Sequence, residues 1–172
     1  KEVDPASADT IHANNVKRVI RALEYYQQTG QKISEHNEAE REKESAYNSA
    51  YFVLTDDRKI LYDRIDKRVD LMMQEGLLEE VNALRLRGLK RESVAMQGLG
   101  YKELFGYFEG EYPLEEAVRI IKRDTRHFAK RQLTWFRRER DVIWLDKSEI
   151  GREDEQLIQQ MLTVLKKKEI IH

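Results

Sequence analysis

The chain has 172 residues, of which 40% are hydrophobic and 37% charged, and its 31 Lys and Arg residues are nearly balanced by 32 Asp and Glu residues. This length and composition fit one globular domain or a large part of one. The absence of cysteine excludes a disulfide framework, a thiolate zinc site and a cysteine nucleophile, and no apolar run approaches the ~20 residues that span a bilayer.

The first third of the chain predicts short helices. Asp4 and Pro5 suit the N-cap and first position of one helix, and Asn14 can cap a second helix over residues 15–28. Residues 31–45 are polar throughout. They predict either a mobile connection or a solvated helix.

The helix of residues 15–28 has two different faces. Its apolar stripe, which we expect to be buried, consists of Val16, Val19, Ile20 and Leu23. Its other side carries Lys17, Arg18, Arg21, Tyr25 and Gln28. Phosphate contacts combined with one stackable ring would use such a face, although this pattern alone is a weak signal for RNA.

Two short apolar runs, residues 49–54 and 142–146, predict strands. Strands of a parallel sheet that are buried on both faces have this composition. We therefore expect both runs in one parallel sheet, whose other strands lie outside this chain. Long helical periods account for the rest: 58–74 (capped by Thr55 or Asp56), 77–86, about 100 to 109, 114–138 and 153–168. The predicted fold is mainly α with two short strands.

The helix of residues 114–138 is strongly basic. Nine Lys or Arg residues lie between Val118 and Arg140, against only two acids. Five of them fall within a sector of roughly 60° on a helical projection. These are Arg119, Arg123, Arg126, Lys130 and Arg137. The opposite stripe of Ile121, Phe128 and Trp135 is expected to pack inward. Few acids stand at i±4 to balance the cations, which favours polyanion binding over a merely solvated face.

Two further segments could bind anions or a nucleotide backbone. Arg64 and Arg68 lie one helical turn apart, a spacing that suits a diphosphate leaving group. Ion pairs with Asp63, Asp66 or Asp70 are the alternative, which the spacing alone favours. Residues 97–102, QGLGYK, form a glycine-containing turn before a helix, where φ > 0 and close backbone approach are possible. No GxxxxGK[ST] loop occurs in the chain.

Four segments resemble the tRNA dimethylallyltransferase (tRNA isopentenyltransferase) family in order and approximate spacing. They are IHANNVKRVIRALE with TG (11–24 and 29–30), LYDRIDKRVDLMMQEGLLEEV (61–81), QGLGYKEL (97–104) and TRHFAKRQLTWFR (125–137). The combination of GYKEL and KRQLTWFR at this separation is specific. The resemblance reaches across most of residues 4–146.

The resemblance implies a fold and an activity. Members transfer a dimethylallyl group from dimethylallyl diphosphate to N6 of the adenine 3′ of the tRNA anticodon, with the base flipped out. Their fold is an α/β sheet related to P-loop kinases, carrying a helical tRNA-binding insertion. Residues 1–45 would end that insertion, 46–146 would complete the catalytic core, and 147–172 would add a C-terminal helix. The resemblance also implies a cytoplasmic, monomeric enzyme that binds a nucleotide, uses Mg²⁺ and is not associated with a membrane.

The resemblance also assigns residues. Arg68 would face the diphosphate, with Arg64 as the second choice. The anticodon stem-loop would contact Lys17, Arg18, Arg21, Gln97, Gly98, Leu99, Gly100, Tyr101, Lys102, Arg126, Lys130, Arg131, Gln132, Thr134, Trp135 and Arg137. The family's P-loop, its proposed general base and most of the Mg²⁺ site would precede residue 1, so this piece alone is expected to be inactive.

Composition and basic helices without the motifs would instead favour a helical RNA-binding module that has no chemistry of its own. A purely structural α-helical protein is a third possibility, and it predicts no tRNA affinity at low salt.

Overall fold

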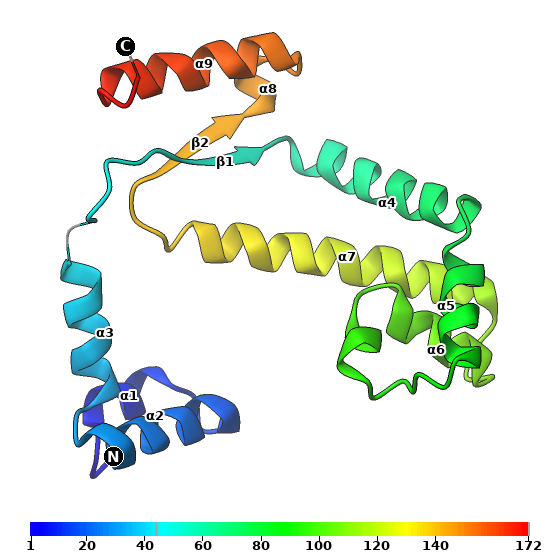
Figure 1. The fold of residues 1–172 in the computed structure, drawn as a ribbon, viewed down its shortest axis with the longest axis horizontal. Helices are drawn as coiled ribbons and strands as arrows, with labels where there is room; N and C mark the ends of the chain where they lie inside the picture. The colour runs from blue at the N-terminus through cyan, green and yellow to red at the C-terminus, as the bar shows by residue number, and fades with distance from the viewer. Residues whose placement is uncertain (44, 172) are drawn as a thin grey trace. The chain divides into compact units, whose positions relative to one another are not determined.

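The computed structural model describes residues 1–43 and 45–171, and the chain divides into two compact units, residues 1–48 and 49–172 (Figure 1). The first unit contains three helices in its described part: α1 (Pro5–Thr10), α2 (Val16–Thr29) and α3 (Ile33–Glu42). Of the two alternatives for residues 31–45, the solvated helix is confirmed over Ile33–Glu42, because α3 has no buried residue; residue 44 of that stretch lies outside the described residues.

Asp4 ties α1 to α3. Its carboxylate accepts hydrogen bonds from the N–H and hydroxyl of Ser7 at 3.0 and 2.7 Å, and from the N–H and hydroxyl of Ser34 at 3.1 and 2.7 Å. One side chain thus satisfies free amides at the start of both helices. Burial alone would raise the pKa of Asp4, but these hydrogen bonds outweigh it and lower the pKa well below its usual range.

Helix α2 differs from its prediction in two ways. Its N-cap residue is Asn15 and not Asn14, and the Asn15 side chain makes no capping hydrogen bond. The N–H of Asn14 donates to Nδ1 of His12 at 3.2 Å. The predicted buried stripe is also wrong: Val16, Ile20 and Leu23 are exposed, Val19 is half-buried, and only Ala22 is buried. Helix α2 packs on α3, and this contact leaves most of the apolar stripe uncovered within the unit.

The second unit contains a two-stranded parallel sheet in its described part, formed by β1 (Tyr51–Thr55) and β2 (Val142–Asp146). The predicted parallel pairing is confirmed, and the register places Thr55 opposite Asp146. The carboxyl ends of the two strands are therefore level. Val53 and Leu145 are buried, whereas Leu54 and Trp144 remain exposed, so both strands keep uncovered surface.

Helices form the rest of the second unit. They are α4 (Arg58–Gln74), α5 (Leu77–Leu86), the 3₁₀ helix η1 (Val94–Gln97), α6 (Tyr101–Phe108), α7 (Leu114–Phe136), α8 (Lys147–Ile150) and α9 (Asp154–Lys167). The predicted cap of α4 is wrong. Asp57 caps it, accepting hydrogen bonds from the N–H groups of Lys59 and Ile60 at 2.9 and 3.2 Å. None of the described helices is both long enough and apolar enough to cross a membrane.

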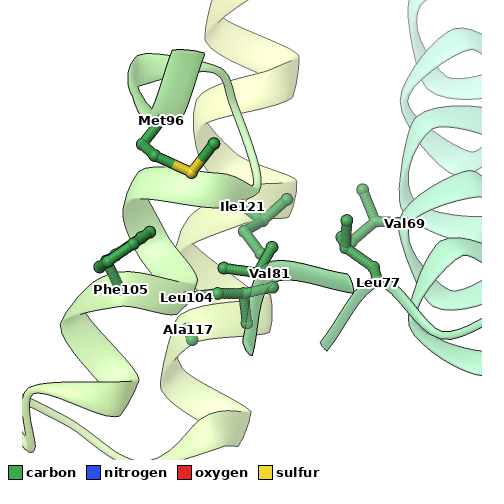
Figure 2. Packing of buried hydrophobic residues seen from close by; sticks show 8 residues of the cluster. All are labelled: Val69, Leu77, Val81, Met96, Leu104, Phe105, Ala117 and Ile121. Carbon is green, nitrogen blue, oxygen red and sulfur yellow. The ribbon is translucent and has the colours of Figure 1, made fainter. Parts of the chain in front are cut away.

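The core of the second unit lies where α4, α5, α6 and the first half of α7 meet (Figure 2). Its buried members are Val69, Leu77, Val81, Met96, Leu104, Phe105, Ala117 and Ile121. The prediction that α7 packs inward along its whole apolar stripe is right for Ile121 and wrong for Phe128 and Trp135, which are 44% and 54% exposed. The buried core residues of α7, Ala117 and Ile121, both lie in its first half.

Candidate functional site

Helices α4 and α7 lie side by side (Figure 1) and are joined by two ion pairs. Arg126 pairs with Asp66 at 2.5 Å, and Lys122 pairs with Asp70 at 2.6 Å. Residues 66 and 70 stand about 200° around α4 from residues 64 and 68. Asp66 and Asp70, on one face of α4, therefore form ion pairs with α7, while Arg64 and Arg68 lie on the opposite face. This arrangement contradicts ion pairing of Arg64 or Arg68 with Asp66 or Asp70.

The arginines of α4 line a cleft of about 490 Å³ at the carboxyl end of β1. We call it the arginine cleft; its walls are Leu54, Thr55, Asp56, Leu61, Arg64, Ile65, Lys67, Arg68 and Lys147. Within the described part of the chain, none of its four cations forms an ion pair. The carboxyl ends of parallel strands are the usual position of ligand sites in α/β sheets. The cleft therefore suits an anion.

Asp56 is the only carboxylate in that wall, and Arg152 holds it. Arg152 Nη2 lies 2.9 Å from Oδ1 and Nε lies 3.3 Å from Oδ2, while the N–H of Asp57 donates to Oδ1 at 2.8 Å. The hydrogen bond from Arg152 is the main reason that the pKa of Asp56 is lowered, and the charge of Arg64 adds to the effect. Sequence reasoning missed this pair, because 96 residues separate its members and no periodicity links them.

A second cleft, of about 600 Å³, lies between α7 and the strand ends. We call it the α7 cleft. Lys130, Thr134 and Arg137 line it, together with the ring of Trp144. Three predicted tRNA-contacting residues are therefore brought together here. Both clefts share Thr55, Asp56 and Leu61 as walls, so they meet at the carboxyl end of β1.

The remaining predicted residues on α7 fall into two groups. Arg131, Gln132 and Trp135 are exposed on the same half of the helix as the α7 cleft, and the guanidinium carbon of Arg131 lies 5.7 Å from the ring centroid of Phe128. Arg126, by contrast, is half-buried in its ion pair with Asp66.

The expected row of unopposed cations is wrong for the first half of α7. Arg119 pairs with Glu116 at 2.5 Å, and Arg123 pairs with Asp124 at 2.7 Å. Counting acids at i±4 missed these partners, because they stand at i−3 and i+1, and missed the acids of α4 altogether.

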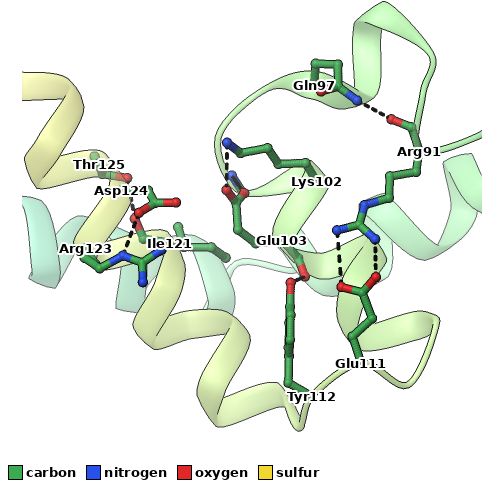
Figure 3. Close-up of polar contacts among 11 residues, drawn as sticks. Arg91, Gln97, Lys102, Glu103, Glu111, Tyr112, Ile121, Arg123, Asp124 and Thr125 are labelled. Carbon is green, nitrogen blue, oxygen red and sulfur yellow. Dashed lines mark hydrogen bonds and ion pairs between the residues drawn. The ribbon is translucent and has the colours of Figure 1, made fainter.

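Hydrogen bonds and an ion pair fix the turn of residues 97–102 to neighbouring parts of the protein (Figure 3). Gln97 Nε2 donates to the carbonyl of Arg91 at 2.5 Å, and the N–H of Gly100 donates to Oε2 of Glu103 at 2.8 Å. Tyr101 donates its hydroxyl proton to Glu80, and Lys102 Nζ lies 3.3 Å from Oε1 of Glu103. Several polar groups predicted to contact tRNA are thus engaged within the protein.

Only one of the two glycines in this turn has a backbone conformation that favours glycine. Gly100 has φ +98°, which requires glycine, whereas Gly98 has φ −62°. Gly98 is exposed and Leu99 half-buried. The stretch around Gly98 is therefore the part of the turn at which an outside backbone can approach.

In the first unit, the predicted cationic face of α2 is open. Lys17, Arg18 and Arg21 are exposed. Tyr25 is half-buried, because its ring packs on that of His36 with centroids 5.1 Å apart. The cations are therefore available for phosphate, but the ring proposed for stacking already has a partner.

A metal site is not assembled by the described side chains alone. Within residues 1–43 and 45–171, no three His, Asp or Glu residues are grouped so that they could hold a metal ion. Mg²⁺ commonly takes one or two carboxylates together with substrate phosphates. The use of Mg²⁺ stays a prediction from the resemblance.

Comparison with known proteins identifies the family of this chain. The model of the IPP transferase family matches residues 1–139, and the chain belongs to that family. Among curated proteins, it is similar to the tRNA dimethylallyltransferase of Lachnoclostridium phytofermentans (56% identity over 99% of this chain and 54% of the relative). It is also similar to that of Acetivibrio thermocellus (51% identity, 94% and 51%). The resemblance inferred from the motifs is confirmed.

Solved structures agree with this assignment. The tRNA isopentenylpyrophosphate transferase of Bacillus halodurans is similar over 97% of this chain and 50% of that one, with 40% identity and a TM-score of 0.69. A eukaryotic dimethylallyltransferase acting on tRNA is similar over 94% and 42%, with 28% identity and a TM-score of 0.75. The chain spans about half the length of these relatives. The predicted fold class, mainly α with two parallel strands of a larger sheet, is confirmed.

Proposed function

We propose that this chain supplies the diphosphate-facing arginines and part of the tRNA-binding surface of a tRNA dimethylallyltransferase. The observation that carries the proposal is the arginine cleft at the carboxyl end of β1, in which Arg64 and Arg68 form no ion pair with any residue that the structure describes. The names of its relatives support the same activity. Cytoplasmic location, monomeric state and nucleotide binding stay predictions from the resemblance.

The chemistry explains the need for fixed cations. N6 of the adenine attacks C1 of the dimethylallyl group, the C1–O bond breaks, and the diphosphate departs with the bonding pair while N6 loses a proton. Negative charge therefore grows on the diphosphate oxygens toward the transition state. Guanidinium groups remain charged at all relevant pH values and can donate paired hydrogen bonds to these oxygens. Mg²⁺, whose site the family resemblance places mainly outside this chain, would share in neutralising the diphosphate.

The α7 cleft gives the tRNA a place beside the diphosphate. Lys130 and Arg137 would contact backbone phosphates, and the exposed ring of Trp135 can stack on an unpaired base. Because the two clefts meet at the end of β1, a base held in the α7 cleft would bring its amine close to a diphosphate in the arginine cleft. The cationic face of α2 would add phosphate contacts from the first unit.

Single-turnover prenylation by the full-length protein tests the role of Arg68. Removing one fixed donor from a site of growing charge costs about 10²–10³ in rate. We expect that loss for Arg68→Ala and a partial recovery for Arg68→Lys, which keeps the charge and loses the fork. The effect should fall on kcat more than on KM, because the contact strengthens toward the transition state. Affinity for tRNA should stay unchanged.

Arg85→Ala is the matched control, because Arg85 lies on α5 and hydrogen-bonds Asn82 at 2.9 Å away from both clefts. It should retain wild-type turnover. Wild-type turnover by Arg68→Ala would remove the assigned role. A wild-type protein that binds tRNA but never prenylates it would instead establish the helical RNA-binding module.

A further inference from the structure

The arginine cleft contains one feature that opposes diphosphate binding. Asp56 places a carboxylate among Arg64, Arg68 and the other cations of the wall. An aspartate carboxylate is ionised near neutral pH at its ordinary pKa, and the hydrogen bond from Arg152 lowers that pKa further. A full negative charge at this position would repel a diphosphate, and it would also offer Arg64 an acidic partner inside the cleft.

Arg152 removes that opposition. Its guanidinium donates to both carboxylate oxygens, at 2.9 and 3.3 Å, in the paired geometry that suits arginine. The Asp56 side chain is only 3% exposed, whereas Arg152 is 49% exposed. The carboxylate is therefore enclosed, and its charge is neutralised by an arginine of the C-terminal segment, residues 147–171. The cations of the cleft stay free of it.

The local fold directs Arg152 to this position. Asp146, the last residue of β2, caps α8 by accepting hydrogen bonds from the N–H and hydroxyl of Ser148 at 2.8 and 2.6 Å. Helix α8 ends at Ile150 and is followed by Gly151, whose φ of +114° is strained for any other residue. The reversal after α8 thus places Arg152 beside the end of β1.

We propose that Arg152, a residue of the C-terminal segment, neutralises Asp56 and thereby sets the affinity of the arginine cleft for diphosphate. Arg152 is a positioning residue that acts through Asp56. The inference rests on the proposed function, because it assumes that the arginine cleft receives the diphosphate. With both Asp56 oxygens engaged by Arg152 and the N–H of Asp57, the carboxylate is not presented as a base or a metal ligand.

Binding of inorganic diphosphate to the full-length protein, measured by calorimetry, tests the inference. Arg152→Ala should raise the Kd by about tenfold, the size of one like-charge contact at partly screened range. The KM for dimethylallyl diphosphate should rise in parallel. Arg152→Lys should lie between, since it keeps the charge and loses the paired donors.

The decisive variant removes the carboxylate as well. If Arg152 acts by neutralisation, Arg152→Ala combined with Asp56→Asn should restore the Kd to within about twofold of wild type, because no charge remains to be neutralised. If Arg152 is only a brace, the double variant stays as impaired as Arg152→Ala, and the inference is overturned. Should Arg152→Ala fail to fold, Asp56→Asn alone decides: affinity that is unchanged or tighter supports neutralisation, and weaker affinity overturns it.

Two further variants separate the possible failures. Arg91→Ala removes an arginine that also pairs with a carboxylate, Glu111, but lies outside both clefts; its Kd for diphosphate should equal that of wild type. Combined Arg64→Ala and Arg68→Ala should weaken diphosphate binding strongly. If they do and Arg152→Ala does not, the inference alone fails. If they do not, the arginine cleft is not the diphosphate site and the proposed function loses its support.

Discussion

The two halves of α7 share a basic composition but differ in how their cations are used. In the first half, Arg119, Lys122, Arg123 and Arg126 each pair with an acid, and Ala117 and Ile121 enter the core. In the second half, Lys130, Arg131 and Arg137 form no ion pair with any described residue, and the rings of Phe128 and Trp135 are exposed. The first half of α7 fixes the helix to the protein core, and the second half leaves its cations accessible to a ligand.

The difference shows that a basic stripe is not a binding surface along its whole length. A cation that already has an acid partner gains less from a phosphate, because the existing contact must be given up first. Only the second half of α7 lines the cleft that meets the arginine cleft. Binding should therefore depend on position along the helix and not on the number of positive charges.

The largest expected effect concerns stability. Ile121→Ala should destabilise the full-length protein by about 3 kcal/mol, because Ile121 is 2% exposed and its truncation leaves a cavity in the core. Phe128→Ala, one heptad further along the same stripe, should cost less than about 1 kcal/mol, because much of the ring is already in water. Urea unfolding of both variants measures the difference. Equal losses would show that the second half of α7 is as well anchored as the first.

The next effect concerns tRNA. Replacing Lys130 and Arg137 together by Gln should lower affinity for an anticodon stem-loop and flatten the plot of log K against log salt by about 1.5 units, since two phosphate contacts are lost. The matched control replaces Arg119 and Arg123 by Gln, which removes the same charge from the paired half. Filter binding of full-length variants over a salt series measures both slopes. Similar flattening in both would contradict the distinction between the halves.

The approximate positions of the helices and strands could be predicted from the sequence, because local signals define them. Glycines at 76, 88 and 110 interrupt the helical periods, and the two β-branched, apolar runs stand apart from everything else. The parallel pairing of those runs also followed, since short apolar strands separated by helices have few other arrangements. The burial of individual apolar side chains could not be predicted in this way. Whether Phe128 or Ile20 is covered depends on which neighbouring element reaches it, and the apolar stripe carries no information on that.

The candidate site was predictable in part for the same reason. The spacing of Arg64 and Arg68 indicated a diphosphate contact but did not exclude ion pairs with the acids of their own helix. The structure weakens that alternative, because α7 engages Asp66 and Asp70. The pairing of Asp56 with Arg152 had no sequence signal at all. Contacts between elements, and not residue types, separate cations that are free for a substrate from those that are not.

The smallest expected effect arises where the two halves of α7 meet, at Arg126. The family resemblance assigns Arg126 to tRNA, whereas the structure pairs it with Asp66 across the α4–α7 contact. Both statements hold if Arg126 exchanges partners when tRNA binds. Asp66→Asn should then strengthen tRNA binding by about twofold to threefold, because the competing charge is removed.

The same substitution should lower stability by no more than about 1 kcal/mol, because both side chains are roughly one-third exposed and solvent screens the pair. Asp70→Asn is the control: it breaks the neighbouring ion pair with Lys122, which is not a predicted tRNA contact, and should leave tRNA affinity unchanged. If Asp66→Asn binds tRNA no better than wild type while Arg126→Ala also binds normally, Arg126 belongs wholly to the anchoring half. The boundary between the halves would then lie between Arg126 and Lys130.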